Sequence, residues 1–351
     1  MDLKPFPSFP LRLSVYTFGH FFFEFTANYF IIALIAPQIS SSAQMIEVLL
    51  FYNLFDYGFQ VLIGLVDDIV HRNHFFAACG AALFIIGYFC SPIPNLMAAV
   101  IGLGAAFIHV PLGRQVLLDR PHSYAPLAPF VASGAFGVFL GRRAGFTSLP
   151  LSWPVLACAI VVLSLLIALG TAEREGNAHA ERENATKSLR FTKIGIVAVL
   201  ILVLTVAVQS FTFAILVFPW DSGALAWLAA ITIMLGKAVG GFFADRFGYR
   251  TTIIGSSLVA LAAAAFAPSY PILGLIFLFA LNIPSATLIS RIAKRLAPAL
   301  GTGFGLYKFF HLVGFFPTLF WGTGHPVSPI NLILLTIVIG GLMLAEGQLK
   351  E

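Results

Sequence analysis

The apolar stretches of this sequence constrain its fold more than any other feature, because each is long enough to cross a lipid bilayer as a helix. A membrane-spanning helix needs roughly 20 predominantly apolar residues. Scanning at that length gives twelve stretches, which cover residues 12–36, 44–66, 74–90, 94–113, 124–141, 152–170, 194–218, 223–244, 251–268, 270–290, 299–321 and 328–346. Transmembrane strands would instead appear as short segments of alternating polarity. The sequence therefore predicts an all-α, polytopic membrane protein.

The composition excludes the main soluble classes. Hydrophobic residues make up 59% of the chain and charged residues only 10%, whereas soluble domains carry about 25% charged residues. A soluble enzyme, a nucleic-acid-binding protein and a disordered scaffold are therefore excluded. The three cysteines lie in apolar stretches without paired spacing, at Cys79, Cys90 and Cys158. We expect no disulfide framework, no metal site and no cofactor.

One long hydrophilic segment, residues 171–193, interrupts the apolar pattern just after the middle of the chain. It predicts a linker between an N-terminal six-helix bundle, residues 1–170, and a C-terminal six-helix bundle, residues 194–351. Sixteen of the 20 lysines and arginines fall on the side of the membrane that holds the N-terminus and the linker. By the positive-inside rule, we expect both termini in the cytoplasm and the chain in a bacterial inner membrane. This placement explains the basic excess without nucleic acid.

An internal repeat relates the two halves. Three residue pairs share a spacing of 177 positions, namely Gly64 with Gly241, Asp68 with Asp245, and Arg114 with Arg291. The glycines and aspartates follow the second and eighth spans, and basic residues flank them at Arg72, Arg246 and Arg250. Two parallel six-helix repeats are typical of secondary transporters.

The second copy of the repeat, GKAVGGFFADRFGYR at 236–250, resembles the G-x-x-x-D-R-x-G-R-[RK] loop of the major facilitator superfamily. The resemblance implies twelve helices in two pseudo-symmetric six-helix bundles. In the first copy Ile69 replaces the usual arginine and His71 replaces the glycine. We therefore expect a poorer hydrogen-bond network around Asp68 than around Asp245.

The chemistry of this loop suggests a gate. An aspartate can accept hydrogen bonds from the N-terminal amides of a helix in the other half, where the helix dipole favours an anion. Such contacts, with arginines that pair across the halves, would stabilise one state of a rocking pair of bundles. The alternative interpretation is a turn whose charges only set the topology.

Charged groups near the middle of a membrane cost about 2.5–3.5 kcal/mol on insertion scales, so they are candidates for function. The first span carries a polar stripe at a spacing of four residues, formed by Tyr16, His20, Glu24 and Asn28. A carboxylate one helical turn from an imidazole can share or relay a proton. We expect this stripe to handle protons or substrate, with a structural hydrogen bond as the alternative.

Other polar residues lie inside later spans. Asp56 in span 2 shares a face with Asn53 and Gln60, and is a second candidate for proton coupling or substrate binding, with packing as the alternative. Lys308 and His311 share a face of span 11, where Lys308 would hold an anionic substrate or pair with an acid. Lys237 in span 8 lies close enough to the membrane surface to snorkel. His109 precedes Pro111 in span 4 and fits a structural role as well as a functional one.

Three spans also resemble the fosmidomycin-resistance branch of the superfamily. The resemblance rests on Gly19-His20-Phe21 with Glu24, on Pro37, and on the segment Gly102-Leu103-Gly104-Ala105-Ala106-Phe107-Ile108-His109. The glycines Gly134, Gly137 and Gly141 also resemble the glycine-rich fifth helix of drug antiporters. The resemblance implies efflux by an antiporter and an anionic or drug-like substrate.

Taken together, these features predict a monomeric secondary transporter that moves a small organic solute by alternating access, coupled to protons. The chain has no Walker A sequence, so primary active transport within it is excluded. The alternatives are a membrane protein that does not transport, such as a sensor or an integral-membrane enzyme, and a facilitator without proton coupling. The solute and the direction of transport are not encoded in any motif.

Overall fold

The computed structural model describes residues 8–147, 150–173, 193–321 and 328–349, and these residues form helices without any strand. Each of the twelve apolar stretches corresponds to a helical segment in the described part of the chain. The fold is therefore all-α, as predicted. The expected linker, residues 171–193, lies almost entirely outside the described residues.

Backbone contacts divide the chain into two units. Unit 1 comprises Met1–Pro121, Gly137–Leu189 and Ala297–Gly305, and unit 2 comprises His122–Phe136, Arg190–Leu296 and Leu306–Glu351. Each unit thus consists mainly of one half of the chain and also contains a short segment of the other half. Two helices change unit along their length, α6 (Leu127–Phe146) and α14 (Leu300–Phe315).

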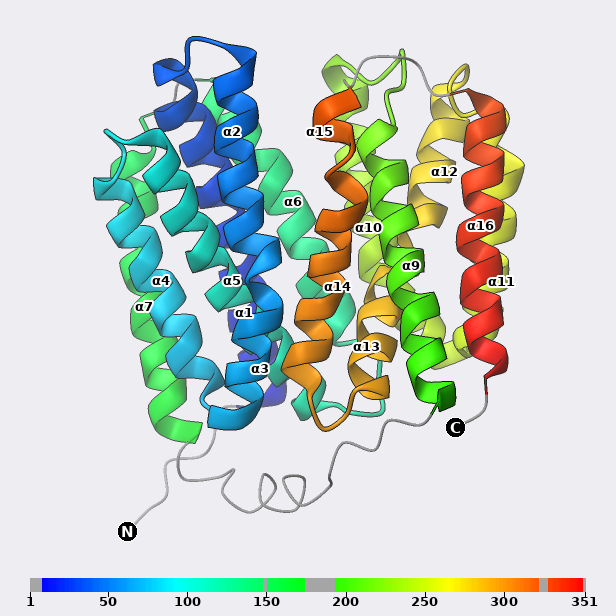
Figure 1. Cartoon of the computed structure of the whole chain (residues 1–351), viewed down its shortest axis with the longest axis horizontal. Coiled ribbons are helices and arrows are strands. Elements are labelled where there is room, and N and C mark those ends of the chain that lie inside the picture. The colour runs from blue at the N-terminus through cyan, green and yellow to red at the C-terminus, as the bar shows by residue number, and fades with distance from the viewer. Residues whose placement is uncertain (1–7, 148–149, 174–192, 322–327, 350–351) are drawn as a thin grey trace. The chain divides into compact units, whose positions relative to one another are not determined.

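Unit 1 is built around α5. Its elements are α1 (Phe9–Phe30), η1 (Ile31–Ile35), η2 (Ala36–Gln38), α2 (Ser42–Asn53), η3 (Leu54–Gly58), α3 (Gln60–Val70), α4 (Asn73–Phe89), α5 (Pro94–Asp119) and α7 (Ser152–Glu173). Helix α5 packs against α1, α2, η3, α3 and α4, while α4 also packs against α7 (Figure 1). Side chains that point inward from these helices therefore meet at α5.

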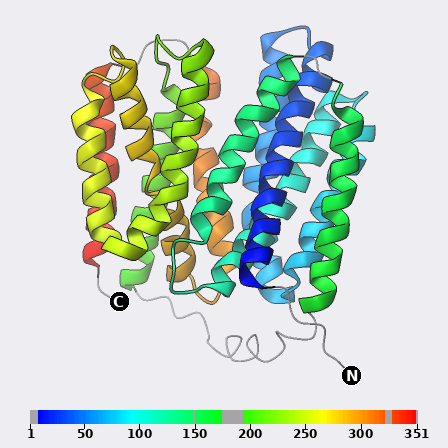
Figure 2. The ribbon, with the colours of Figure 1, turned by 180° about the vertical axis from the view of Figure 1, so that it is seen from behind.

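Unit 2 contains the remaining elements: α9 (Lys193–Ile215), α10 (Gly223–Phe247), α11 (Tyr249–Ala264), α12 (Pro271–Asn282), α13 (Ser285–Arg295), α15 (Thr318–Trp321) and α16 (Pro329–Gln348). Helix α11 packs against α10, α12 and α16 (Figure 2). Helix α9 packs against α13 and α16 (Figure 1). Eight helical segments in the described part of the chain are long and apolar enough to cross a membrane, judged by length and composition.

Local sequence explains where several helices begin and end. Proline opens α5 at Pro94 and α12 at Pro271, in the first turn, where its missing N–H costs nothing. Between α3 and α4 the chain turns at His71, with φ of 55°. The equivalent turn between α10 and α11 uses Gly248, with φ of 84°. Both angles lie in the left-handed region that glycine adopts without steric cost.

Several helix boundaries differ from the sequence prediction, including those of α6, which runs from Leu127 to Phe146 and not over 124–141. Helix α5 continues through Pro111 to Asp119, so Arg114 lies inside the helix and not at its end. The second span continues as α2, η3 and α3 as far as Val70. The tenth span is two helices, because the chain breaks before α13 at Pro284, which has no N–H to donate.

Candidate functional site

A buried chain of polar side chains runs across three elements of unit 1. His109 on α5 lies between two carboxyl groups: its Nε2 is 3.0 Å from Glu24 Oε1 on α1, and its Nδ1 is 3.1 Å from Asp56 Oδ1 on η3. All three side chains are buried, with relative exposures of 1% for His109, 6% for Glu24 and 0% for Asp56. One imidazole therefore connects two carboxyl groups that are far apart in the sequence.

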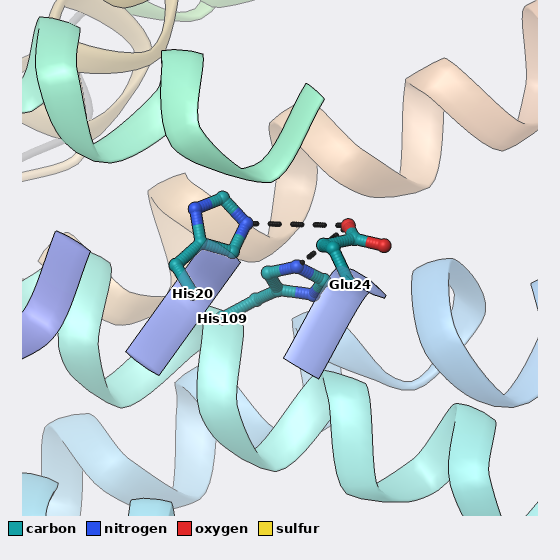
Figure 3. A group of neighbouring side chains, drawn as sticks. All are labelled: His20, Glu24 and His109. Carbon is teal, nitrogen blue, oxygen red and sulfur yellow. Dashed lines mark hydrogen bonds and ion pairs between the residues drawn. The ribbon is translucent and has the colours of Figure 1, made fainter. Parts of the chain in front are cut away.

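Two further residues complete the group. Gln60 donates from Nε2 to Asp56 Oδ1 at 2.8 Å and fixes that carboxyl group beside His109. His20 lies one helical turn before Glu24, with its Nε2 4.0 Å from Glu24 Oε1 and its ring edge-on to that of His109 (Figure 3). We refer to His20, Glu24, Asp56, Gln60 and His109 as the His109 cluster.

Glycines allow the helices that carry this cluster to approach closely. A Cβ atom at Gly102 of α5 would lie 2.5 Å from the carbonyl oxygen of Tyr52, next to the segment that carries Asp56. A Cβ atom at Gly137 of α6 would lie 2.4 Å from the carbonyl oxygen of Phe21 and 3.1 Å from Glu24 Cβ. Asp56 itself belongs to a π-helical segment, and such segments are frequent at functional sites.

The arrangement suits proton storage and transfer. Both ring nitrogens of His109 face carboxyl oxygens, so a proton on either nitrogen has an acceptor at hydrogen-bond distance. Carboxyl and imidazole groups exchange protons near neutral pH when their surroundings are tuned. A proton that arrives at Glu24 can therefore pass through the ring to Asp56 without entering the apolar interior.

Two of the predicted polar residues of unit 1 lie beside the cluster and not in it. Asn28 donates to the backbone oxygen of Glu24 at 2.9 Å and accepts from Arg142 Nε at 3.0 Å. Asn53 donates to the backbone oxygen of Leu49 at 2.7 Å, which is a local helical contact. Asn28 therefore bridges Glu24 and Arg142, whereas the contact of Asn53 stays within its own helix.

The basic candidates lie in unit 2. Lys308 and His311 are on the part of α14 that belongs to this unit, and Lys237 is on α10. Lys308 is close enough to act electrostatically on both Lys237 and His311. The described part of unit 2 therefore gathers basic side chains where unit 1 gathers acids and histidines.

The loop aspartate of the first repeat copy has an extensive network, contrary to the sequence prediction. Asp68 accepts from the backbone N–H groups of Gly301 and Thr302 at 2.9 and 2.7 Å, in the first turn of α14. The Thr302 hydroxyl also donates to it, and Arg114 pairs with it at 2.8 Å. The expectation of a poorer hydrogen-bond network around Asp68 was wrong. Ile69 stands where the motif has an arginine, but Arg114 on α5 supplies a guanidinium group to Asp68 instead.

The loop aspartate of the second copy has a comparable position. Asp245 accepts from the backbone N–H groups of Tyr124 and Ala125 at 2.8 and 3.0 Å, in the turn that leads into α6, and from the Ser123 hydroxyl. Tyr124 and Ala125 are 177 positions before Gly301 and Thr302, the spacing of the repeat. We call these two arrangements the Asp68 cap and the Asp245 cap.

The glycines of the repeat sit at the same two contacts. A Cβ atom at Gly64 would lie 2.3 Å from the carbonyl oxygen of Gly301, and one at Gly241 would lie 2.4 Å from that of Tyr124. Any larger residue would push the first turn of α14, or the turn before α6, away from its aspartate.

The arginines of the repeat differ from one another. Arg114 also donates to Asn73 at 2.8 Å and contacts His71 Nδ1 at 2.7 Å, whereas Arg291 pairs through two bonds of 2.7 Å with the buried Glu346. Arg250 donates to the backbone oxygen of Gly347 at 3.0 Å. Arg72 and Arg246 are exposed, and within the described residues no hydrogen bond joins their side chains to another group.

Sequence reasoning missed several members of these networks. The sequence pattern shows Gln60 only as a neighbour of Asp56, and it gives no signal for Glu346, Asn73 or Ser123. Gly301 and Thr302 were detectable, because they are the residues that the repeat spacing places opposite Tyr124 and Ala125. Glu346 carried no such signal, since only the packing of α16 brings it to Arg291.

Comparisons with known proteins bear on the fold. No protein-family model matches the sequence, and no curated protein matches it either. Among solved structures, the chain is similar to FucP, described as a major facilitator superfamily transporter in the outward conformation, with 13% identity and a TM-score of 0.63. It is also similar to a variant of the E. coli fucose:proton symporter FucP, with 13% identity and a TM-score of 0.64. Both matches cover 97% of this chain and 98% of the other. The chain therefore has the major facilitator fold.

Proposed function

We propose that this protein is a secondary transporter that moves a small organic solute across a lipid bilayer by alternating access, coupled to protons through the His109 cluster. The observation that carries the proposal is His109 between two buried carboxyl groups, Glu24 and Asp56. Ionisable groups inside a membrane fold are costly and are commonly kept for proton or substrate pathways. Facilitated diffusion without coupling would not require such a chain.

The solute-binding contribution of unit 2 is proposed from its charge. Lys237 and Lys308 present ammonium groups inside α10 and α14, which favours an anionic solute. The structural neighbour FucP is named as a fucose:proton symporter, whereas the likeness to the fosmidomycin-resistance branch favours export in exchange for protons. The compounds to be tested for transport therefore form a panel of fucose, organic anions and drug-like compounds.

The two caps are proposed as the gate. Each aspartate holds the start of a helix that changes unit along its length, α14 at the Asp68 cap and α6 at the Asp245 cap. Loss of a cap would free that helix start and shift the population of states. With the termini in the cytoplasm, both caps would lie on the cytoplasmic side.

The test uses purified protein in proteoliposomes with pyranine trapped inside. An imposed pH gradient is applied, and the compounds of the panel are added one at a time. We expect at least one compound to produce a proton flux, and the radiolabelled form of that compound to accumulate against its gradient. The sign of the proton flux distinguishes symport from antiport.

The control for substitutions in the His109 cluster is Gln209→Ala on α9 of unit 2, where Gln209 is buried and donates to the backbone oxygen of Leu281. It should leave coupling intact. If solute uptake does not depend on the pH gradient, the proposal of proton coupling is wrong and the protein is a facilitator. No movement of any compound, in protein that is folded and monodisperse, would favour a sensor or enzyme.

A further inference from the structure

Two imidazoles and a carboxylate converge in the His109 cluster from two helices. One ring nitrogen of His20, one ring nitrogen of His109 and a carboxylate oxygen of Glu24 all lie within 4.8 Å of one another, and all three residues are buried. Figure 3 shows both rings directed at the same carboxyl group. Two histidines and one carboxylate are a common ligand set for divalent transition metals, which bind imidazole nitrogen at about 2.0–2.1 Å.

The hydrogen-bond partners of His109, namely Asp56 and Gln60, are of the kind that orient a metal-binding histidine. A histidine that ligates a metal through one nitrogen usually donates the N–H of the other to a carboxylate, which fixes the tautomer. His109 Nδ1 lies 3.1 Å from Asp56 Oδ1, and Gln60 holds that carboxyl group at 2.8 Å. Gln60 Nε2 also lies 3.1 Å from His109 Nδ1. In the tautomer whose Nδ1–H points to Asp56, His109 Nε2 offers its lone pair toward Glu24.

We propose that His20, Glu24 and His109 bind one divalent transition metal ion of the zinc class, with Asp56 as the carboxylate that orients His109. The ion takes the place of the proton between Glu24 Oε1 and His109 Nε2, which are 3.0 Å apart. His20 Nε2, at 4.0 Å from the same oxygen, completes the set with a small side-chain rotation. Three protein ligands leave coordination positions for water.

This inference goes beyond transport and does not depend on it. The sequence alone predicts no metal site, because the ligands have no spacing typical of one: His20 and Glu24 are one turn apart, but His109 lies 85 residues later. The packing of α1 on α5 creates the set. Metal binding can therefore be measured on resting protein, without a solute or a gradient.

The experiment uses the full chain in detergent, carrying an affinity tag without histidines, stripped with a chelator and desalted. Cobalt(II) is titrated in and the visible absorption bands are recorded, then zinc(II) is added to displace it. We expect saturation at one equivalent per chain and loss of the cobalt bands when zinc is added. D56N should weaken binding by about 10–100-fold, and the variants H20Q, E24Q and H109Q should each weaken it more than D56N does.

Two matched controls separate this site from adventitious binding by histidine. His74→Gln removes a buried histidine of unit 1 that contacts Tyr16 at 2.9 Å, and His311→Gln removes a histidine of unit 2. Both should bind cobalt as the wild type does. For any ligand variant that unfolds, Glu24→Asp keeps a carboxylate and should retain the bands in altered form. The proposal is overturned if wild-type protein gives no one-to-one cobalt spectrum, or if H20Q and H109Q bind cobalt like the controls.

Discussion

The two halves of the chain agree at their caps and differ in their interior. At the spacing of 177 residues, Asp68 corresponds to Asp245, and the amide donors Gly301 and Thr302 correspond to Tyr124 and Ala125. At the same spacing, Asp56 corresponds to Ile233, Gln60 to Lys237 and His109 to Ala286. The geometry that starts α6 and α14 is thus kept in both halves.

The difference indicates what each half contributes. The cap is a backbone requirement, because the first amides of a helix need acceptors whatever the protein transports. The interior chain of acids and histidines is a chemical requirement, and one copy is sufficient. Unit 1 therefore carries the proton chemistry that we propose, and unit 2 carries the basic groups at Lys237, Lys308 and His311.

The strongest test of this asymmetry is Glu24→Gln, which mimics the protonated carboxyl group. We expect complete loss of accumulation driven by a pH gradient, with counterflow exchange of the same solute retained, because the uncharged amide cannot release a proton. The measurement compares both assays in the same proteoliposomes. Wild-type accumulation in Glu24→Gln would make Glu24 structural and leave Asp56 as the coupling candidate.

The two aspartates should contribute differently to the stability of the folded protein, although they occupy equivalent positions in the repeat. Asp68→Asn leaves the buried Arg114, which is 3% exposed, without its carboxylate, so we expect a loss of about 3–5 kcal/mol. Asp245→Asn loses charge-assisted hydrogen bonds to the turn before α6 and should cost about 1.5–3 kcal/mol. Thermal unfolding in detergent measures both. A larger loss of stability for Asp245→Asn would mean that the second copy of the loop has the stronger hydrogen-bond network, as the sequence predicts.

Substitution of the two equivalent arginines should also show a larger loss of stability in the first half, at Arg114, than in the second half, at Arg291. Arg114→Gln removes the cation of Asp68 and should cost about 2–3 kcal/mol. Arg291→Gln leaves Glu346 paired with Arg295 at 3.0 Å, so the loss should stay below about 1.5 kcal/mol. The double variant Arg291→Gln with Arg295→Gln should exceed either single change, because Glu346 then stays buried without a cation. Equal losses for Arg114→Gln and Arg291→Gln would contradict this account.

The smallest effect concerns the turns that follow the caps. Gly248→Ala should cost about 1–2 kcal/mol, because φ of 84° is unfavourable for any residue with a Cβ atom. His71→Gly should be nearly neutral, since it relieves the strain at φ of 55° but loses the contact with Arg114. The unfolding assay that is applied to the caps measures both changes. A marked gain for His71→Gly would mean that the His71–Arg114 contact contributes little.

Much of the fold could be predicted from hydropathy, because a span must be long and apolar wherever it packs. The repeat was also visible, since Asp68 and Asp245 stand in equivalent loops. The His109 cluster was visible only in part: Glu24 and His20 share a helix face, but the link from His109 to Asp56 depends on how α5 is rotated against η3. Asp56 lies in a local π-helical turn at Leu54–Gly58, and no periodicity in the sequence predicts this turn.

The grouping of residues into units has a consequence for biosynthesis. Unit 1 includes Ala297–Gly305, so the polypeptide that leaves the ribosome first cannot finish its own unit until about 300 residues have been made. Until α14 begins, the carboxylate of Asp68 has Arg114 but none of the amides that it accepts from in the native protein. The C-terminal half likewise lacks His122–Phe136 when it is produced alone. Either half alone should therefore be less stable than the full chain, and co-expression of the two halves should rescue both. Maturation of unit 1 therefore waits for the synthesis of Ala297–Gly305.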